Sequence, residues 1–449
     1  MSGNAGTQLD KDRLTLKYKL LLGLMIGFFV VVTFESAARF LEHPMSGDFK
    51  HFYYAAYGIV HDQNIYTSGY PFTGQHWYAY MPLFAIVLSP LVGLGLGGAG
   101  AAWTVINAGL IGACIFITVR EAVTRLGIKA TPNMLVGVAF LVVLVFMDKI
   151  RGELRLGQSD AFVMIWMMLG LMWITKRPIL AGIMIGGSVN VKLQGLVFLP
   201  WLIVRGRVKN LVGFVIGTVF FAMAGSLIWG VEQNMQYLST MFGWVGDLIG
   251  IQSTQAVVES ELYPLEWERS VTIPSVLARA QIHWGLSESF VKFGTLAMIG
   301  LIVATGWGLY RKRGLALLKG RSGKRDDGSA TGRGLIGLEW SGLIVGMLIF
   351  SPQSTVRHFF LAIIVVALGA AVLHTEIDRK RKMGVGIMMV VFWASMTFPP
   401  GGDEFSVAMA NWRAVGGAMW ALVGLYMAVL WAGLGIVREL PENVPNTGA

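Results

Sequence analysis

Residues 178–204 read PILAGIMIGGSVNVKLQGLVFLPWLIV and contain a single charged side chain, that of Lys192. An α-helix needs about 20 residues to cross a bilayer. The apolar segments on either side of the lysine, 178–190 and 193–204, are both shorter than that, so the stretch predicts a hairpin of half-length helices. A lysine at that depth is costly unless it has a partner, and the short helices cannot bring it to the far membrane surface. We expect Lys192 to belong to a functional site.

Longer apolar runs flank this hairpin and set the fold class. The chain is 55% hydrophobic and 14% charged, whereas a soluble domain carries about 25% charged residues, which excludes a soluble enzyme. The predicted spans are 18–41, 99–119, 132–148, 158–174, 208–229, 289–310, 335–351, 355–374, 383–398 and 413–437. With the hairpin they give about twelve crossings. We expect one all-α, polytopic integral membrane domain over residues 1–449, with both termini on the same side.

Two apolar segments have a second interpretation. Residues 18–41 follow a basic start and resemble a signal peptide. Because the apolar run continues to Leu41, and Glu35 and Arg39 stand one helical turn apart, we favour a retained anchor. Residues 82–95 are apolar but are interrupted by proline and glycine. They predict a half-helix or a re-entrant piece that leads into the span at 99–119.

The net charge of +10 would indicate a nucleic-acid partner in a soluble protein. In a membrane protein the positive-inside rule explains it, because lysine and arginine gather in cytoplasmic loops. The largest basic block, at 311–334, has a Gly/Ser-rich centre at 328–332 and predicts a mobile cytoplasmic loop. We therefore expect no nucleic-acid partner, and binding of DNA by this loop is the disfavoured alternative.

Two long loops, 42–80 and 230–288, fall on the opposite side and are rich in tyrosine or tryptophan. Aromatic side chains at this density are typical of helices that lie in the membrane interface. In the first loop Asp48 stands directly before an amphipathic stretch. Its carboxylate is placed either to cap that helix or to act as a general base at the membrane–water boundary.

Several polar side chains share the outer side of this topology. Arg357 and His358 stand at the outer end of a predicted span. Together with Lys192 they would form a cationic pocket that suits an anionic group such as a phosphate. Gln158 and Asp160 begin another span on the same side, so we assign them to the same site.

Motifs of nucleotide-driven and hydrolytic chemistry are missing from the sequence. It has no Walker-type glycine loop, no His-Glu-x-x-His, no Gly-x-Ser-x-Gly and no dinucleotide fingerprint. Energy for a reaction must therefore come from the substrate, as from a lipid-linked activated group. The single cysteine, Cys114, excludes an internal disulfide and a cysteine-based metal cage. Glu259 and Glu261 could hold a metal ion, but an acidic surface loop is favoured, and we expect no metal and no other cofactor.

Four motifs follow one another along the chain. They are Asp48…Tyr53-Tyr54-Ala55-Ala56 with Ile65-Tyr66, Tyr80-Met81-Pro82-Leu83-Phe84-Ala85…Ser89-Pro90-Leu91, Gly157-Gln158-Ser159-Asp160 with Arg177-Pro178…Lys192, and Ser351-Pro352…Arg357-His358. In this order they resemble glycosyltransferase family 87 over about residues 48 to 360. Two positions depart from the family pattern: Met81-Pro82 replaces the second proline pair, and Asp160 stands where asparagine is common. Both departures leave the transferred sugar open.

The resemblance implies a GT-C fold, which is a multi-helix membrane protein with its active site on the non-cytoplasmic face. The protein would then lie in the cell membrane with cytoplasmic termini and an active site facing outside. It would use polyprenyl-phosphate-mannose as donor and a lipid or glycan as acceptor, with no obligate protein partner. Asp48 matches the catalytic aspartate of the family, and Lys192 and His358 match positions that line the donor site. The further residues that we expect to contact the donor phosphate or sugar are Arg357, Gln158, Asp160, Tyr53, Tyr54 and Tyr80.

In the implied mechanism Asp48 takes the proton of an acceptor hydroxyl, which attacks the anomeric carbon in one inverting step. Mannose is inherited from the resemblance, and an arabinose or other pentose donor would leave the same charges in place. The competing function is that of a secondary transporter or flippase of a lipid-linked or anionic substrate. Half-length helices that meet at a charged residue are also typical of transporters.

Overall fold

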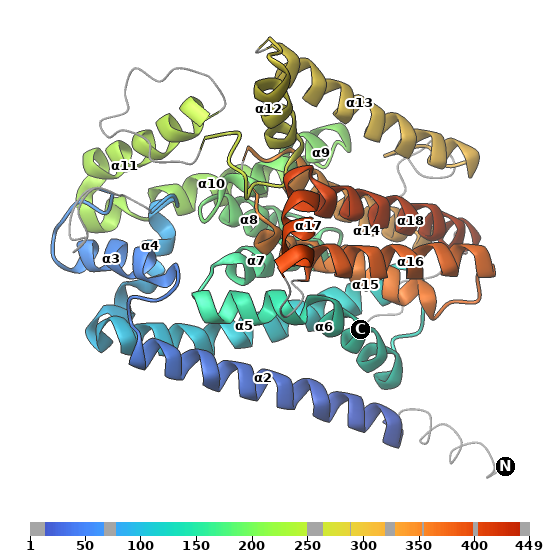
Figure 1. Cartoon of the computed structure of the whole chain (residues 1–449), viewed down its shortest axis with the longest axis horizontal. Coiled ribbons are helices and arrows are strands. Elements are labelled where there is room, and N and C mark those ends of the chain that lie inside the picture. Colours follow the sequence, from blue (N-terminus) through green and yellow to red (C-terminus); the bar gives the residue numbers. More distant parts are fainter. Residues whose placement is uncertain are drawn as a thin grey trace. The chain divides into compact units, whose positions relative to one another are not determined.

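A computed structural model of the chain describes residues 14–66, 78–248, 264–287, 289–318, 328–352, 354–397 and 403–440. These residues form helices and connecting turns but no strand (Figure 1). Among them, seven helices are long and apolar enough to cross a membrane, or up to eight if one bent pair counts as a span. The expected all-α, polytopic class is confirmed, and the count of about twelve crossings stays a prediction.

The chain divides into two compact units. Unit 1 comprises residues 1–29, 113–150 and 268–449, and unit 2 comprises residues 30–112 and 151–267. Three of the boundaries between them fall inside helices, namely α2 (Leu16–Glu42), α5 (Gly95–Arg125) and α6 (Pro132–Leu156). The expectation of one domain over residues 1–449 stays a prediction.

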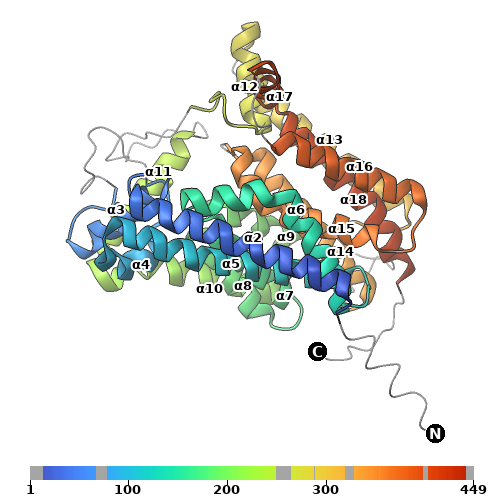
Figure 2. The same cartoon turned by 60° about the horizontal axis from the view of Figure 1, so that its bottom comes forward.

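Unit 2 is built largely from short helices. Besides parts of α2, α5 and α6, it contains α3 (Phe49–Val60), α4 (Pro82–Leu88), η1 (Ser89–Leu94), α7 (Asp160–Trp173), α8 (Pro178–Val189), η2 (Leu193–Val197), α9 (Phe198–Val204), α10 (Val208–Met223) and α11 (Ser226–Leu248). Proline stands in the first turn of α4, η1 and α8. Proline has no N–H, and the first turn of a helix does not need one for its hydrogen bonds. Helix α3 packs against α4 and η1 (Figure 2). Helix η1 is followed directly by α5, and Gly95 at their junction has a non-helical backbone with φ +68° and ψ 166°.

The two short helices predicted on either side of Lys192 are present as α8 and as η2 followed by α9. Helix α8 packs against α10 through glycines spaced four residues apart on both helices. A Cβ added at Gly182 or Gly186 would overlap the backbone of α10, and one added at Gly213 or Gly217 would overlap the backbone of α8. Small residues at this spacing let two helix backbones approach closely, as in many membrane helix pairs.

The predicted span at 208–229 is not one continuous helix, because the chain bends there, and whether the bent pair crosses the membrane stays a prediction. Helix α10 ends at Met223 and α11 begins at Ser226, with an angle of 97° between them. The side chain of Asn234 stabilises the bend by donating from Nδ2 to the Ala222 carbonyl oxygen at 3.0 Å. This carbonyl is one of those that a helix end leaves without an intrahelical partner.

The basic segment predicted as a loop at 311–334 is shorter than expected. Helix α13 (Ser289–Lys312) extends into its start, and α14 (Ala330–Phe350) begins before its end. Ser329 caps α14 by accepting the N–H of Gly332 at 2.9 Å. The Gly/Ser-rich stretch at 328–332 therefore begins a helix and is not the centre of a mobile loop. Residues 319–327 lie outside the described residues.

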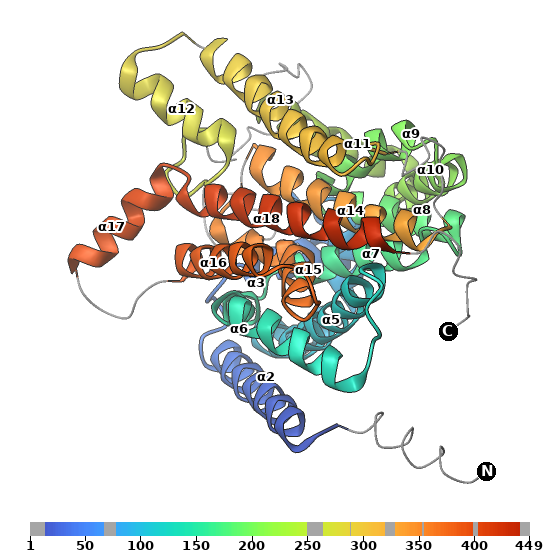
Figure 3. The ribbon, with the colours of Figure 1, turned by 90° about the vertical axis from the view of Figure 1, so that its right-hand side faces the viewer.

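Unit 1 is a bundle of longer helices around a buried one. Besides parts of α2, α5 and α6, it contains α12 (Ile273–Trp284), α13, α14, η3 (Val356–Ala362), α15 (Ile363–Leu373), α16 (Arg379–Met396), α17 (Asp403–Ala414) and α18 (Gly417–Glu439). Helices α14, α15 and α16 all pack on α18, and α12 packs on α13 (Figure 3). All residues of α15 from 363 to 372 are buried, as expected for a helix that is apolar on every side.

The close glycine packing between α8 and α10 predicts the effect of adding one methyl group. Gly186→Ala places its Cβ against the Phe214 carbonyl oxygen, and such overpacking costs about 1–3 kcal/mol. We expect a lower thermal unfolding midpoint in detergent micelles. The control is Gly109→Ala on α5, where a Cβ meets nothing within 4 Å and alanine favours the helix by about 0.5–1 kcal/mol. Equal midpoints for the two variants would contradict the close backbone approach.

Candidate active site

The turn between α6 and α7 is fixed by a glycine in the left-handed conformation. Gly157 has φ +66°. Its N–H donates to the Leu154 carbonyl oxygen at 3.2 Å, and the next N–H, of Gln158, donates to that of Glu153 at 3.0 Å. These are the two hydrogen bonds of a Schellman motif. A Cβ at Gly157 would lie 2.6 Å from the Cβ of Phe49, so the position requires glycine for space as well as for conformation.

Two buried side chains of α5 hold the backbone of this turn. Trp103 donates from Nε1 to the carbonyl oxygens of Gly157 and Gln158, both at 3.2 Å. Asn107 donates from Nδ2 to the Gln158 carbonyl oxygen at 3.1 Å. The carbonyl groups of Gly157 and Gln158 in this turn are therefore paired within the protein, as buried backbone groups must be.

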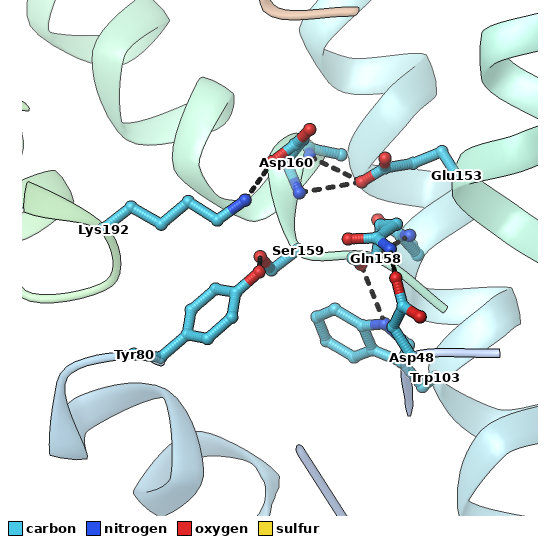
Figure 4. A network of polar contacts seen from close by, with 10 residues as sticks. Asp48, Tyr80, Trp103, Glu153, Gln158, Ser159, Asp160 and Lys192 are labelled. Atoms are coloured by element: carbon cyan, nitrogen blue, oxygen red, sulfur yellow. Dashed lines mark hydrogen bonds and ion pairs between the residues drawn. The ribbon is translucent and has the colours of Figure 1, made fainter. Parts of the chain in front are cut away.

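Asp48 is attached to the same turn. Its N–H donates to the Leu156 carbonyl oxygen at 2.9 Å. Gly47 makes this approach possible, because it has φ +80° and a Cβ there would lie 2.8 Å from that oxygen. The half-buried side chain of Asp48 accepts a hydrogen bond from Nε2 of Gln158 (Figure 4). Asp48 occupies the N-cap position of α3 but makes no side-chain cap hydrogen bond, so the interpretation of this residue as a helix cap is wrong.

Glu153 is a site residue that the sequence analysis missed. It is 3% exposed, and its Oε1 accepts the N–H groups of Asp160 at 2.8 Å and Ala161 at 3.2 Å. A carboxyl oxygen at the N-terminus of α7 accepts hydrogen bonds from N–H groups that the helix leaves unpaired. We had ended the preceding span at residue 148, whereas α6 continues to Leu156. The helix-stopping Gly157 was the signal that could have placed Glu153 in the last turn of that helix.

Lys192 finds its partner in Asp160. The ammonium group of Lys192 forms an ion pair with Oδ1 of Asp160, and the two side chains are 12% and 1% exposed (Figure 4). The same ammonium lies 5.1 Å from the ring centroid of Tyr80. Ser159 donates from Oγ to the Tyr80 hydroxyl at 3.1 Å. Four residues from three separate parts of the sequence thus form one polar network at the start of α7.

The histidine nearest to Asp48 in the sequence is neutral at physiological pH. Burial lowers the pKa of His51, the positive charge of Lys50 lowers it too, and the Asp48 carboxylate opposes both effects, with a pKa of about 4 as the net result. His51 therefore adds no positive charge next to Asp48 at pH 7.

Two of the three tyrosines expected at the donor, Tyr53 and Tyr54, lie on α3, and their contact with the sugar stays a prediction. Tyr53 is buried and donates its hydroxyl to the Val92 carbonyl oxygen at 3.3 Å. Tyr54 is half-buried, and its ring contacts those of Tyr53 and Tyr57. Burial raises the pKa of both phenols, followed by the effect of neighbouring tyrosines. Both hydroxyls therefore stay protonated at physiological pH. Of the predicted tyrosines, Tyr80 is the one that the described contacts bring to Lys192.

Arg357 and His358 belong to η3 of unit 1, whereas Lys192 belongs to unit 2. Arg357 is exposed and His358 is half-buried. The segment that precedes them is held by the end of the second predicted loop, since Ser275 donates from Oγ to the Pro352 carbonyl oxygen at 3.3 Å. A cationic pocket of all three residues stays a prediction.

Among the described residues, no group of three or more His, Cys, Asp or Glu side chains is placed to hold a metal ion. Glu259 and Glu261, which we considered as a metal site, lie outside those residues.

The sequence matches one known protein family. Residues 78–322, more than half of the chain, match the family model of glycosyltransferase family 87. Together with the helices of spanning length, this match defines a membrane glycosyltransferase. The chain belongs to glycosyltransferase family 87. No curated protein and no solved structure was found to match it.

The matched residues contain most of the polar network but not all of the predicted site. Gln158, Asp160 and Lys192 lie inside the match, together with Tyr80. Asp48 precedes the match, and the predicted residues of η3 follow it.

The buried ion pair predicts a strong coupling between its two partners. Removing one partner of such a pair costs about 3–5 kcal/mol, because the other charge stays buried, whereas replacing both costs much less. We expect Lys192→Met to lower the thermal unfolding midpoint strongly and Lys192→Met with Asp160→Asn to restore most of the loss. Arg151→Met is the control. It breaks a pair with Glu35 whose side chains are 49% and 47% exposed, and such a pair contributes about 0–1 kcal/mol. Additive losses in the double variant would argue against the ion pair.

Proposed function

We propose that this chain transfers a sugar, most simply mannose, from a polyprenyl-phosphate donor to a hydroxyl group of a lipid or glycan acceptor. The reaction takes place on the non-cytoplasmic face of the cell membrane, with the termini in the cytoplasm, and inverts the anomeric centre. The observation that carries the proposal is the half-buried Asp48 carboxylate, bound to the same turn whose other end holds the Lys192–Asp160 pair. Family membership supports the reaction class.

Asp48 is the general base of this reaction. It takes the proton of the acceptor hydroxyl while the oxygen of that hydroxyl attacks the anomeric carbon of the donor. The bond between the anomeric carbon and the phosphate oxygen breaks, and its electron pair stays on the departing polyprenyl phosphate. Because attack and departure occur on opposite faces of the sugar, a β-linked donor gives an α-linked product. The donor supplies the energy, so the scheme uses no nucleotide and no cofactor.

Lys192 stabilises the charge that grows on the departing phosphate. An ammonium group has three N–H donors, and the bond to Asp160 uses one of them. Asp160 thus holds the ammonium in place while a phosphate shares it. Arg357 and His358 add positive charge at the phosphate in this proposal. In this proposal Tyr80, whose ring centroid lies 5.1 Å from the ammonium of Lys192, contacts the sugar.

The role of Asp48 predicts loss of transfer in Asp48→Asn. A positioned general base contributes about 100- to 10,000-fold to a rate. We expect at least a 100-fold lower rate of mannose transfer from radiolabelled polyprenyl-phosphate-mannose to membrane lipids, with an unchanged unfolding midpoint. Asp62→Asn is the control, since Asp62 lies in the turn after α3. Transfer at the wild-type rate by Asp48→Asn would remove Asp48 from the chemistry. If the wild type transfers no label, other prenyl-linked sugars are tested next, and then flux of a lipid-linked substrate.

The role of Lys192 predicts weaker donor binding when its charge is removed. The test compares two variants: the double variant, which carries both Lys192→Met and Asp160→Asn, and Asp160→Asn alone as its reference. Neither variant leaves a buried Asp160 carboxylate without its lysine. We expect the double variant to raise the donor KM by about tenfold or more relative to Asp160→Asn, since a hydrogen bond to a charged group is worth about 1.5–3 kcal/mol. Lys209→Ala, at an exposed position of α10, is the control. An unchanged donor KM would exclude a contact between Lys192 and the phosphate.

A further inference from the structure

Gln158 faces Asp48 in a geometry that only one orientation of its side-chain amide can satisfy. A carboxylate accepts hydrogen bonds and donates none, so the amide nitrogen, Nε2, must point at Oδ2 of Asp48, as it does (Figure 4). Gln158 is 5% exposed, whereas Asp48 is half-buried. The hydrogen bond therefore joins a buried donor to a carboxylate that solvent can still reach.

The backbone of Gln158 is anchored on both sides of its Cα. Its N–H donates to the Glu153 carbonyl oxygen at 3.0 Å. Its own carbonyl oxygen accepts from Trp103 at 3.2 Å and from Asn107 at 3.1 Å. The fixed backbone and the burial of the side chain, which is 5% exposed, together restrict the positions that the amide can take. It can therefore hold a carboxylate within the narrow tolerance that catalysis needs.

Asp48 is attached to this turn at two points. Its backbone N–H bonds to the Leu156 carbonyl oxygen at 2.9 Å, and its side chain bonds to Gln158, two residues further along the chain. The backbone hydrogen bond fixes the position of the Cα, and the amide hydrogen bond fixes the rotation of the carboxylate. Neither bond alone would fix both.

We propose that Gln158 is the positioning residue of the general base and does not bind the donor. It orients the Asp48 carboxylate toward the acceptor hydroxyl. This inference rests on the proposed function, in which Asp48 is that base. It differs from our sequence-based assignment of Gln158 to the donor phosphate or sugar, and it is supported by the hydrogen bond from the amide to the Asp48 carboxylate.

The hydrogen bond itself can be tested without any substrate. Gln158→Glu keeps the size of the side chain but sets a second carboxylate against Asp48. We expect its thermal unfolding midpoint to fall at pH 8 and to recover toward pH 5, where one of the two groups takes up a proton. The double variant Asp48→Asn with Gln158→Glu reverses the polarity of the hydrogen bond, so it should regain the midpoint at pH 8. Gln236→Glu, at an exposed position of α11, is the control and should show no such dependence. Equal losses in the single and double variants would overturn the hydrogen bond.

The positioning role is tested by the rate of mannose transfer from polyprenyl-phosphate-mannose between pH 5.5 and 8. We expect Gln158→Glu to lower kcat about 10- to 100-fold at pH 8, since small displacements of a catalytic group have effects of this size, with an unchanged donor KM. The ratio of variant to wild-type kcat should rise as the pH falls, because the introduced carboxyl group, once protonated, can again donate to Asp48. The double variant should stay inactive although it is stable.

Three results would overturn the proposal, and they separate it from the proposed function. A raised donor KM with unchanged kcat in Gln158→Glu would assign Gln158 to the donor. A ratio of rates that is constant with pH would make its role merely structural. In both cases Asp48 stays the base if Asp48→Asn is inactive. Wild-type transfer by Asp48→Asn would instead overturn the base itself and this inference with it.

Discussion

A positive charge in an apolar bundle must have a partner, and the pairing of Lys192 with Asp160 meets that constraint. Asp160 is the first residue of α7, so the pair ties the hairpin of short helices to the start of that helix. The same helix end is capped by the Glu153 carboxylate from α6. Two carboxylates therefore converge where two helices meet. Glu153 accepts hydrogen bonds from backbone N–H groups, and Asp160 pairs with the Lys192 ammonium.

The short helices around Lys192 are stable because their backbones lie close together. Half-length helices cannot anchor themselves by length, and lipid supplies no hydrophobic force between helices. Gly182 and Gly186 on α8 lie against the backbone of α10. On α10, Gly213 and Gly217 lie in the same way against the backbone of α8. Van der Waals attraction between the two backbones takes the place of the interactions that longer helices would make with lipid. Lys192 can therefore stay at the turn of a small, rigid hairpin.

The sequence predicted the helical class and the short hairpin because apolar runs report directly on burial in a bilayer. It failed where geometry depends on side chains that are distant in the sequence. The bend at Met223 depends on Asn234, and the interpretation of Asp48 as a helix cap ignored a partner 110 positions away. Lys192 was expected to join other cations at a phosphate, and its partner in unit 2 is a carboxylate that we had placed in the same site for another reason.

Asp48 precedes the residues that match the family model, but it is hydrogen-bonded to residues within that match. Both of its described attachments, to Leu156 and to Gln158, lie within residues 78–322. The matched part of the chain therefore fixes where a carboxylate on the preceding loop must stand. Because Gln158 and Asp160 are two residues apart after the Gly157 turn, one backbone segment positions both the Asp48 carboxylate and the Lys192 ammonium. In the proposed reaction a shift of that segment would move both groups together, and so keep the distance between the attacking hydroxyl and the departing phosphate.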